Sequence, residues 1–464
     1  MQLASSVSAR DLARHARPGP RYTSYPPATT FSPSFGPDQV RATLAHVREH
    51  SPDEPISLYC HIPFCSSLCW YCACNVKVTR ERDRGRSYLD ALIAELALVG
   101  NALGRSQPVA EVALGGGSPN FLTADQHTRL VEAIAENFDL RPGAELGIEC
   151  DPRDTSRDQV DNLARLGFKR LSVGVQDFAP QVQEAIHRQQ SAETTRALVD
   201  HARSRGFTSL NIDLVYGLPG QTRDSLRGTL NAVIAMTPQQ VALFGYAHLP
   251  RRFRHQRLVE RKHSVPGPDD RAALFLVARD TFENAGYIQV GLDHFAPPDA
   301  PLARAARDGS LWRNFQGYSV KRADNLIGFG ASAISSVADA YWQNNPEIPA
   351  FAAAVTAGRA AVVRGMQLDR DDRIRRRVIA TLMCHAQLDF AEIDAECGIR
   401  FEDYFDRELD GLGGPDYAEL IEVDFDARRL RTTPLGTYLI RNVCMVFDRH
   451  LAGSAGRARF SPTM

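Results

Sequence analysis

The sequence predicts an α/β fold organised as an open barrel of six βα units, and two patterns support this prediction. From Ile56 onward, short apolar or β-branched runs alternate with longer helical patterns, which is typical of βα units and a parallel sheet. Polar and glycine residues recur directly after the apolar runs. In a βα barrel these positions lie at the carboxyl ends of the strands, where the loops converge on one mouth.

The expected strands are short and apolar, and the helical patterns between them are longer. Strands are expected at Ile56–His61, Val109–Leu114, Glu145–Cys150, Arg170–Val175, Ser209–Val215 and Gln240–Tyr246. Helices are expected at Tyr88–Val99, Ala124–Asn137 and Asp224–Ala235. A seventh, weaker unit is expected to end at Tyr287–Gly291.

The pattern changes near residue 366, where a mostly helical C-terminal domain is expected to begin. An amphipathic helix with arginines on its opposite face is indicated by the spacing of Ile374, Val378, Ile379, Leu382 and Met383. Two short strands follow, Leu420–Val423 and Arg429–Arg431, joined by a turn at Asp426 and succeeded by a helical run at Gly436–Phe447. This succession is somewhat like a winged helix.

The length and composition of the chain restrict its class. With 464 residues the chain is long enough for two or three domains. We assign residues 1–52 to an N-terminal extension, 53–365 to the barrel and 366–464 to the C-terminal domain. The net charge of −1 argues against a protein that coats nucleic acid, and it favours a C-terminal domain that packs on the barrel as a lid over one that binds DNA.

Neither a membrane span nor a secretory signal is expected from the sequence. No stretch approaches the roughly 20 apolar residues needed to cross a bilayer. The first twenty residues contain arginines and lack the continuous apolar core of a signal peptide. We therefore expect a cytoplasmic protein.

The stretch from Tyr59 to Cys74, with the sequence YCHIPFCSSLCWYCAC, holds five of the nine cysteines. Three of them, Cys65, Cys69 and Cys72, have the spacing Cys-x-x-x-Cys-x-x-Cys. Soft thiolate ligands select zinc, copper(I) or iron–sulfur clusters. A closed zinc site needs a fourth ligand, and no second Cys/His pair follows at the usual distance. Three thiolates better fit a 4Fe-4S cluster whose fourth iron stays free for another ligand. A disulfide-rich knot is disfavoured because a chain of this size does not need one.

Polar residues also follow the other expected strands. The positions are Gly115–Pro119 after the second strand, Glu149 after the third, Gln176 and Asp177 after the fourth, Asp213 after the fifth, and Ala247 and His248 after the sixth. Taken singly, each is more readily explained as a turn, a cap or a satisfied buried group. Taken together, their expected position at the same barrel mouth is stronger evidence for a functional site, because loops at the opposite rim serve stability rather than chemistry.

A Cys-x-x-x-Cys-x-aromatic-Cys loop resembles the motif of radical S-adenosylmethionine (radical SAM) enzymes, whose fold is a partial (β/α)6 barrel. The HIPFC sequence around the first of these cysteines and the additional Cys74 resemble the family of oxygen-independent coproporphyrinogen III oxidases. The resemblance implies that Cys65, Cys69 and Cys72 bind the 4Fe-4S cluster and that Cys74 does not. It extends from Pro18 to Phe447.

The resemblance also implies a set of residues that bind S-adenosylmethionine. These are Tyr59, Tyr71, Gly116, Gly117, Ser118, Glu149, Gln176, Arg188, Asp213, Ala247 and Ile334. The family carries two S-adenosylmethionine molecules, which would account for so many contacts. Physical chemistry supports part of this set, because a carboxylate such as Asp213 can accept from ribose hydroxyls or the ligand ammonium and Arg188 can bind its carboxylate. Tyr59 and His61 are further candidates for catalytic residues.

The activity implied by the resemblance is the oxidative decarboxylation of two propionate side chains of coproporphyrinogen III to vinyl groups. The product is protoporphyrinogen IX, the reaction proceeds through a 5′-deoxyadenosyl radical, and it belongs to haem biosynthesis. We expect a monomer that receives electrons from a donor such as flavodoxin or ferredoxin. Arg21 or Arg313 could hold the substrate carboxylates, although the sequence does not choose among the arginines.

The segment Pro18–Pro27, PGPRYTSYPP, resembles a motif near the active site of the same family. Its prolines exclude a regular helix, so it should run extended. We expect Arg21, Tyr22 and Tyr25 to face the substrate.

Three residues depart from the family pattern, and two alternative functions remain open. Gly245 stands where the family commonly has asparagine and Cys60 where it has an aliphatic residue, whereas Ser118 for threonine keeps the hydroxyl. One alternative is a radical SAM relative that acts as a haem chaperone or modifies haem. The other is a non-enzymatic, zinc-stabilised binding module.

Overall fold

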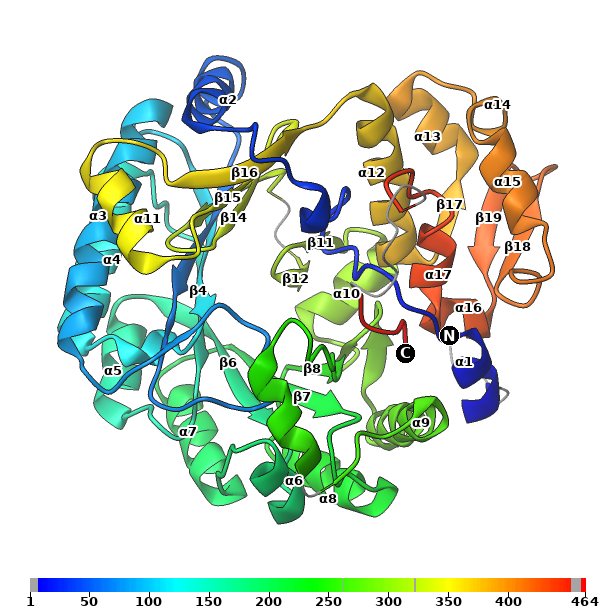
Figure 1. The fold of residues 1–464 in the computed structure, drawn as a ribbon, viewed down its shortest axis with the longest axis horizontal. Coiled ribbons are helices and arrows are strands. Elements are labelled where there is room, and N and C mark those ends of the chain that lie inside the picture. The colour runs from blue at the N-terminus through cyan, green and yellow to red at the C-terminus, as the bar shows by residue number, and fades with distance from the viewer. Residues whose placement is uncertain (1–6, 262, 321–322, 452–459) are drawn as a thin grey trace.

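The computed structural model of the protein describes residues 7–261, 263–320, 323–451 and 460–464. Within them, a sheet of twelve strands curves through the molecule (Figure 1). Its central seven strands are parallel neighbours in the order β13-β1-β4-β5-β6-β7-β8. They are β1 (Ile56–Ile62), β4 (Val109–Gly116), β5 (Glu145–Cys150), β6 (Phe168–Gln176), β7 (Ser209–Tyr216), β8 (Gln240–Gly245) and β13 (Asn325–Phe329). The predicted α/β barrel of six units is confirmed.

Helices follow six of these strands and cover the outer face of the curved sheet (Figure 1). They are α3 (Asp83–Leu103), α4 (Ala124–Asn137), α5 (Arg157–Arg165), α7 (Ala192–Ser204), α8 (Arg223–Ile234) and α9 (Pro268–Asn284). Four of them begin at a Ser or Thr whose hydroxyl accepts from the first turn, namely Thr123, Ser156, Ser191 and Thr222. Each helix therefore starts at a position that its own sequence specifies.

The prediction of a seventh βα unit ending at Tyr287–Gly291 is wrong. Strand β9 (Ile288–Val290) forms an antiparallel hairpin with β10 (His294–Ala296), which adds to the edge of β8. The three residues between the two strands include Gly291 at φ +57°, and so short a connection cannot contain a crossover helix. At the opposite edge β13 pairs with β1 in parallel. The sheet continues there through antiparallel β14 (Ile334–Val337), β15 (Ala340–Asn344) and β16 (Val362–Gln367).

The C-terminal part contains the predicted amphipathic helix, α12 (Arg370–His385), with its predicted apolar residues buried. The two predicted strands are β18 (Ile421–Asp424) and β19 (Arg429–Thr432), which pair with each other, and β19 also pairs with β17 (Gln387–Asp389). The predicted single helical run is two short helices, α16 (Pro434–Tyr438) and α17 (Ile440–Cys444), separated at Leu439. The remaining helices here are α13 (Phe390–Cys397), α14 (Phe401–Tyr404) and α15 (Asp406–Leu412). The domain boundaries after residues 52 and 365 stay predictions.

The shorter elements connect these layers. They are α1 (Ala9–His15), η1 (Ala28–Thr30), α2 (Pro37–His50), β2 (Phe64–Cys65), β3 (Lys77–Val78), η2 (Pro119–Phe121), α6 (Pro180–Ala185), η3 (Arg254–Arg261), α10 (Pro301–Asp308), β11 (Trp312–Asn314), β12 (Gly317–Ser319) and α11 (Ile348–Thr356). None of the helices in the described ranges combines the length and the apolar character of a membrane span.

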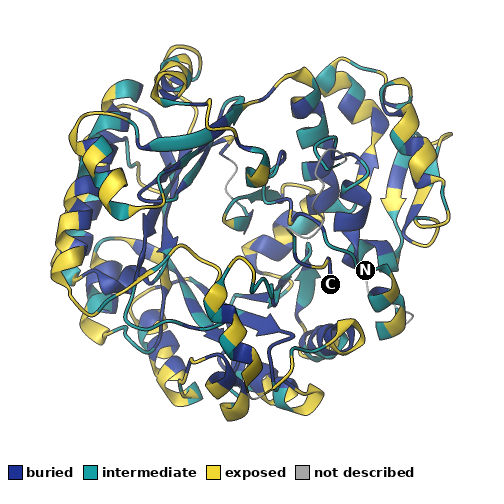
Figure 2. Cartoon of the chain, in the orientation of Figure 1, coloured by how far each residue is buried: buried dark blue, intermediate teal, exposed yellow. Residues whose placement is uncertain are grey.

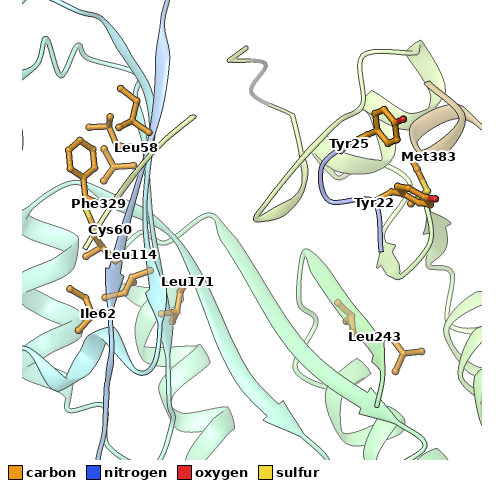
Figure 3. Packing of buried hydrophobic residues seen from close by; sticks show 14 of the residues in the cluster. Tyr22, Tyr25, Leu58, Cys60, Ile62, Leu114, Leu171, Leu243, Phe329 and Met383 are labelled. Carbon is orange, nitrogen blue, oxygen red and sulfur yellow. The ribbon is translucent and has the colours of Figure 1, made fainter. Parts of the chain in front are cut away.

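The N-terminal segment runs across the face between the barrel and the C-terminal helices (Figure 1). Pro18 bridges Pro462 in antiparallel fashion, so both ends of the described chain lie side by side. Tyr22 and Tyr25 are buried, and Figure 3 shows them near Met383 of α12. The segment thus packs against the C-terminal part.

The core lies between the curved sheet and its outer helices, where buried residues dominate the strands (Figure 2). In β1, Leu58, Cys60 and Ile62 are each 0% exposed and lie near Phe329 of the neighbouring strand (Figure 3). Cys60 fills this space as a small apolar side chain, which explains why it can replace an aliphatic residue. Burial on both faces is typical of a parallel sheet covered by helices.

Candidate active site

The loops at the carboxyl ends of the parallel strands line one cavity of about 570 Å³. Most of the residues predicted to bind a cofactor or metal lie on its wall. They are Cys65, Cys69, Tyr71, Cys72, Gly116, Gly117, Ser118, Glu149, Gln176, Arg188, Asp213 and Ala247. The loops therefore meet at one mouth, as the register of the polar residues predicted.

Hydrogen bonds from two neighbouring segments hold the cysteine loop in place. The ring of His187 bonds through Nδ1 to the Leu68 carbonyl at 2.8 Å and stacks on Trp70 with the ring centres 5.0 Å apart. On the other side, Gln256 Nε2 donates to the Tyr71 carbonyl at 2.8 Å. The backbone of the loop is thus fixed before any ligand binds.

Cationic and hydroxyl donors surround the cysteine sulfurs. Arg188 Nη1 and Arg153 Nη2 lie 3.5 and 3.6 Å from Cys69 Sγ. The Ser118 hydroxyl donates to Cys65 Sγ at 3.5 Å. Three thiolates with iron and sulfide form an anionic group, and guanidinium donors stabilise such charge. The donor set therefore fits a cluster bound by three cysteines.

The arrangement of the sulfurs also bears on the kind of metal. Among the described residues, no three His, Cys, Asp or Glu side chains converge as a single metal ion requires. In a 4Fe-4S cluster each thiolate binds a different iron, so the sulfurs need not point at one atom. Cys74 also lines the cavity, and its backbone N–H donates to Cys72 Sγ at 3.4 Å.

The glycine loop after β4 brings the backbone close to two side chains. Gly116 has φ +107°, and its N–H donates to Glu149 Oε2 at 3.2 Å. A Cβ on Gly115 would lie 2.9 Å from the same carboxylate. Glycine is needed here because any side chain would occupy the space of Glu149.

Two carboxylates at the strand ends face the cavity. The Glu149 side chain is open to the cavity but lies deep in the molecule, and this burial, together with nearby Asp213, raises the pKa of Glu149 to about 7. Burial also raises the pKa of Asp213, although Ser172 and Asn211 donate to its oxygens at 2.9 and 2.6 Å. Both groups can therefore accept from a cationic or hydroxyl-bearing ligand.

Three predicted site residues are absent from the lining of this cavity: Tyr59, His61 and Ile334. The His61 ring bonds to the Asn75 carbonyl at 3.0 Å through Nε2, so its Nδ1 accepts from the Tyr59 hydroxyl at 3.2 Å. A Cβ on Gly116 would meet the same ring. His61 thus connects the cysteine and glycine loops. Ile334 packs with the cluster around Phe31.

The structure places further charged residues at the cavity, among them Asp151 and Arg153. Asp151 Oδ2 pairs with Arg188 Nη1 at 3.0 Å and Arg153 Nη2 at 2.6 Å. Both residues belong to the IECDPR stretch that contains Glu149. Their spacing of two and four residues from Glu149, directly after the strand, is the signal that could have revealed them.

Other residues considered from the sequence make bonds outside the cavity. Asp177 accepts from Gln221 and Thr229 at 2.6 and 2.8 Å, so it secures helix connections. His248 bonds to the Tyr246 hydroxyl at 3.0 Å. Asp177 and His248 therefore fit the simpler explanation, that each is a hydrogen-bonded residue with a structural role.

The three residues expected to face the substrate, Arg21, Tyr22 and Tyr25, lie in different surroundings. Arg21 lines the cavity and donates to the Gly245 carbonyl at 3.0 Å. The ring of Tyr22 is instead buried, and its hydroxyl donates to Asp448 at 2.9 Å. Tyr25 is also buried and accepts from the Arg449 N–H at 3.2 Å. The two apolar rings pack against the C-terminal part because burial there is favourable.

A three-cysteine loop at the carboxyl edge of a partial (β/α)6 barrel defines a radical SAM protein. The model of the Radical SAM superfamily matches residues 59–233. Oxygen-independent coproporphyrinogen III oxidase from Pseudomonas aeruginosa is 42% identical over 456 residues, which cover 97% of each chain. The enzyme of that name from Escherichia coli is 43% identical over 444 residues, covering 96% of this chain and 95% of the relative.

A solved structure of the Escherichia coli coproporphyrinogen III oxidase, described as a radical SAM enzyme, superposes with a TM-score of 0.88. It shares 42% identity and covers 93% of this chain and 97% of its own. The chain belongs to the family of oxygen-independent coproporphyrinogen III oxidases.

Proposed function

We propose that the protein decarboxylates two propionate side chains of coproporphyrinogen III oxidatively to vinyl groups and so forms protoporphyrinogen IX in haem biosynthesis. The observation that carries this proposal is the match to coproporphyrinogen III oxidases along nearly the whole chain, N-terminal segment included. Each propionate loses carbon dioxide, one hydrogen atom and one electron. The protein must therefore supply a hydrogen acceptor and an electron exit.

Cys65, Cys69 and Cys72 would hold a 4Fe-4S cluster. When bound, the cluster and S-adenosylmethionine supply the radical chemistry that removes hydrogen from the propionate. Arg153 and Arg188 lie against Cys69 and balance negative charge there. The two guanidinium groups would thereby stabilise an anionic cluster at the wall of the large cavity.

Binding of S-adenosylmethionine is proposed for the walls of the same cavity. Gly116 and Gly117 line the cavity beside the cysteine loop, where their backbone groups can approach the ligand closely. The carboxylates of Glu149 and Asp213 can accept from an ammonium or from ribose hydroxyls. Because Glu149 has a pKa of about 7, it can also hold or release a proton near neutral pH. The proposed positions extend around several strand ends, which supports two S-adenosylmethionine molecules.

The proposal includes the electron donor, the oligomeric state and the location of the protein. An electron donor such as flavodoxin or ferredoxin would reduce the cluster. We propose that the protein works as a monomer in the cytoplasm, where thiols stay reduced and a thiolate-bound cluster persists.

The decisive experiment is an anaerobic assay of purified, cluster-reconstituted protein with coproporphyrinogen III, S-adenosylmethionine and a reductant. Protoporphyrinogen IX and carbon dioxide should form together. Methionine formed without any decarboxylated product would favour a different substrate. Zinc without sulfide in anaerobically purified protein would exclude the radical chemistry altogether.

Cysteine variants test the assignment of the ligands. Cys65→Ala should lose most of the iron and sulfide because two thiolates cannot retain the cluster, and turnover should disappear. Cys74→Ala should keep the metal content of the parent protein. The matched control is Cys397→Ala, which lies on α13 away from the cavity. Iron loss in Cys74→Ala with retention in Cys65→Ala would reverse the assignment.

A further inference from the structure

A second, smaller cavity adjoins the large one and is lined by arginines. Its volume is about 40 Å³. Four guanidinium groups reach it, from Arg21, Arg271, Arg313 and Arg441. Arg21, Phe244 and Gly245 line both cavities, so the two spaces are neighbours.

The charge in this small cavity is unbalanced. The one carboxylate side chain among its lining residues is Asp293, whose Oδ1 lies 3.9 Å from Arg313 Nη1. The other three arginines donate to backbone carbonyls, which carry no net charge: Arg21 to Gly245, Arg271 to Tyr246 and Arg441 to Pro20. Four cationic side chains therefore face one anionic side chain deep in the molecule, at a cavity that the last residue, Met464, also lines.

Some of these guanidinium donors have no partner in the described part of the chain. Nε of Arg271 and both Nε and Nη1 of Arg313 are buried without a hydrogen bond. The two side chains are nearly inaccessible, since Arg271 is 7% exposed and the Arg313 side chain is 5% exposed. Buried charges without a counter-ion are costly, and an anionic ligand removes that cost.

The pKa shifts of three of the four arginines agree with a missing anion. Burial lowers the pKa of Arg21 and Arg271, and neighbouring arginines lower it further. In Arg313 the effect of burial is outweighed by Tyr318 and Asp293, which raise its pKa. Burial and the neighbouring Arg21 lower the pKa of Arg441 to about 9. Nearby anions such as Asp293 oppose these shifts only in part. The four arginines together therefore favour the binding of a negatively charged group.

The size of the cavity selects the kind of anion. A water molecule needs roughly 10–15 Å³ of such volume, so the space suits a group of two or three heavy atoms such as a carboxylate. A macrocycle is far too large for it and must remain in the neighbouring cavity. Arg21 and Gly245 line both spaces, so an arm that reaches the small cavity from the large one must pass the hydrogen bond between Arg21 and the Gly245 carbonyl.

We propose that Arg21, Arg271, Arg313 and Arg441 form a carboxylate-binding subsite that receives a propionate side chain of the tetrapyrrole. This inference rests on the proposed function and adds the residues that bind one substrate arm. Forked guanidinium donors bind carboxylates in two-point contacts, which fix the direction of the arm as well as its charge. The subsite therefore sets the rotation of the macrocycle over the cysteine cavity.

The test compares two probes that differ only in their carboxylates. Coproporphyrin III carries four free carboxylates, and its tetramethyl ester carries none. Their binding to the anaerobic holoprotein is followed by porphyrin fluorescence. The parent protein should bind the free acid more tightly than the ester. Arg271→Met and Arg313→Met should each weaken binding of the acid about 10- to 100-fold and leave the ester unchanged.

A matched control separates this role from a structural one. Arg227→Met removes an exposed arginine on α8 and should bind both probes like the parent protein. Iron content and the melting temperature without ligand should be no lower in Arg271→Met and Arg313→Met, because each change removes a poorly partnered buried charge. If one variant folds poorly, Arg313→Lys retains the charge and should recover part of the affinity for the acid.

The outcomes distinguish this inference from the function on which it rests. Normal affinity for the acid in both folded methionine variants would overturn the subsite but not the activity. Lower melting temperatures in both, without recovery by lysine, would make the arginines structural and also overturn it. Failure of the parent protein to bind coproporphyrin III or to convert coproporphyrinogen III would instead count against the proposed function.

Discussion

Single residues around the glycine loop decide how closely the walls of the cavity approach one another. A Cβ on Gly117 would lie 2.7 Å from the Phe64 carbonyl, and one on Gly116 would meet the ring of His61. The backbone of the loop therefore packs directly on the strand that carries the cysteine loop. This contact is what places the two loops side by side at the cavity.

Gly116→Ala should lower stability and weaken S-adenosylmethionine binding together. The substitution introduces a side chain at φ +107° and against His61, so we expect the free energy of unfolding to fall by about 1–3 kcal/mol. Chemical denaturation and equilibrium binding of S-adenosylmethionine measure the two effects. The control is Gly228→Ala on α8, where a Cβ meets nothing within 4 Å and should raise stability by about 0.5–1 kcal/mol. Equal behaviour of the two variants would show that the loop tolerates a side chain.

Charged neighbours of the cysteines were hard to anticipate at this scale. Glu149 was predicted because it directly follows an expected strand, whereas Asp151 and Arg153 belong to the loop beyond it. Their role depends on Arg188, which comes from a different loop and pairs with Asp151 at 3.0 Å. A contact between side chains on separate loops leaves no periodic trace in the sequence.

At the scale of elements, a buried carboxylate joins a helix to the far edge of the sheet. Glu95 of α3 is 4% exposed. Its Oε2 accepts from the Gly330 N–H at 2.7 Å, and its Oε1 accepts from Asn344 Nδ2 at 2.6 Å. These bonds tie the helix to the turn after β13 and to β15. They hold the part of the sheet from β13 to β15 against the helix.

Glu95 should make stability depend on pH. Burial raises its pKa to about 7, against 4.5 for the free side chain, although the bonds from Gly330 and Asn344 oppose the shift. Its contribution is therefore fully present below about pH 4.5. As pH rises to about 7, the unfolded chain releases this proton first, so the contribution is lost, and it levels off above that range.

Glu95→Gln removes this titration. Relative to the parent protein, the variant should gain up to roughly 3 kcal/mol of unfolding free energy between about pH 4.5 and about pH 8, at about 1.4 kcal/mol per pKa unit. Urea denaturation at a series of pH values measures the difference. Glu136→Gln on the exposed side of α4 serves as the control and should leave the pH profile unchanged. A Glu95→Gln profile parallel to that of the parent protein would contradict the shifted titration.

Most elements of the barrel follow from local sequence, and the exceptions share a physical cause. The predicted helix Ala124–Asn137 matches α4 to its ends, and in the structure the Thr123 side chain caps its first turn. The hairpin Ile288–Ala296 was mistaken for a βα unit because an apolar run does not reveal whether its partner is parallel. The pairing of Asn325–Phe329 with β1 spans more than half the barrel sequence, and periodicity carries no information on such contacts.

At the scale of the whole molecule, the N-terminal segment connects the barrel to the C-terminal part. Arg21 reaches the Gly245 carbonyl at the end of β8. One residue later, the Tyr22 hydroxyl donates to Asp448. Arg441 donates to the Pro20 carbonyl at 2.7 Å. The sequence indicated an extended segment, but it could not indicate these partners because they lie more than 200 residues away.

Because the N-terminal segment is anchored in this way, we expect the stability of the protein to depend on the hydroxyl group of Tyr22. Tyr22 is 5% exposed, and its hydroxyl donates to Asp448 Oδ2 at 2.9 Å, while the backbone N–H groups of His450 and Leu451 donate to the other oxygen. Tyr22→Phe leaves Oδ2 buried without this donor. A hydrogen bond to a charged group contributes about 1.5–3 kcal/mol, so the free energy of unfolding should fall by about that amount.

In Tyr22→Phe the affinity for coproporphyrin III should fall together with the stability. Arg21 directly precedes Tyr22, and its position at the junction of the two cavities depends on the same segment. Denaturation and porphyrin fluorescence measure the two quantities on one preparation. Tyr417→Phe removes a hydroxyl from a half-buried ring and should change stability by less than about 0.5 kcal/mol. Lower stability with normal affinity would show that the segment supports the fold without positioning Arg21. Unchanged stability would mean that the bond to Asp448 does not hold the N-terminal segment in place.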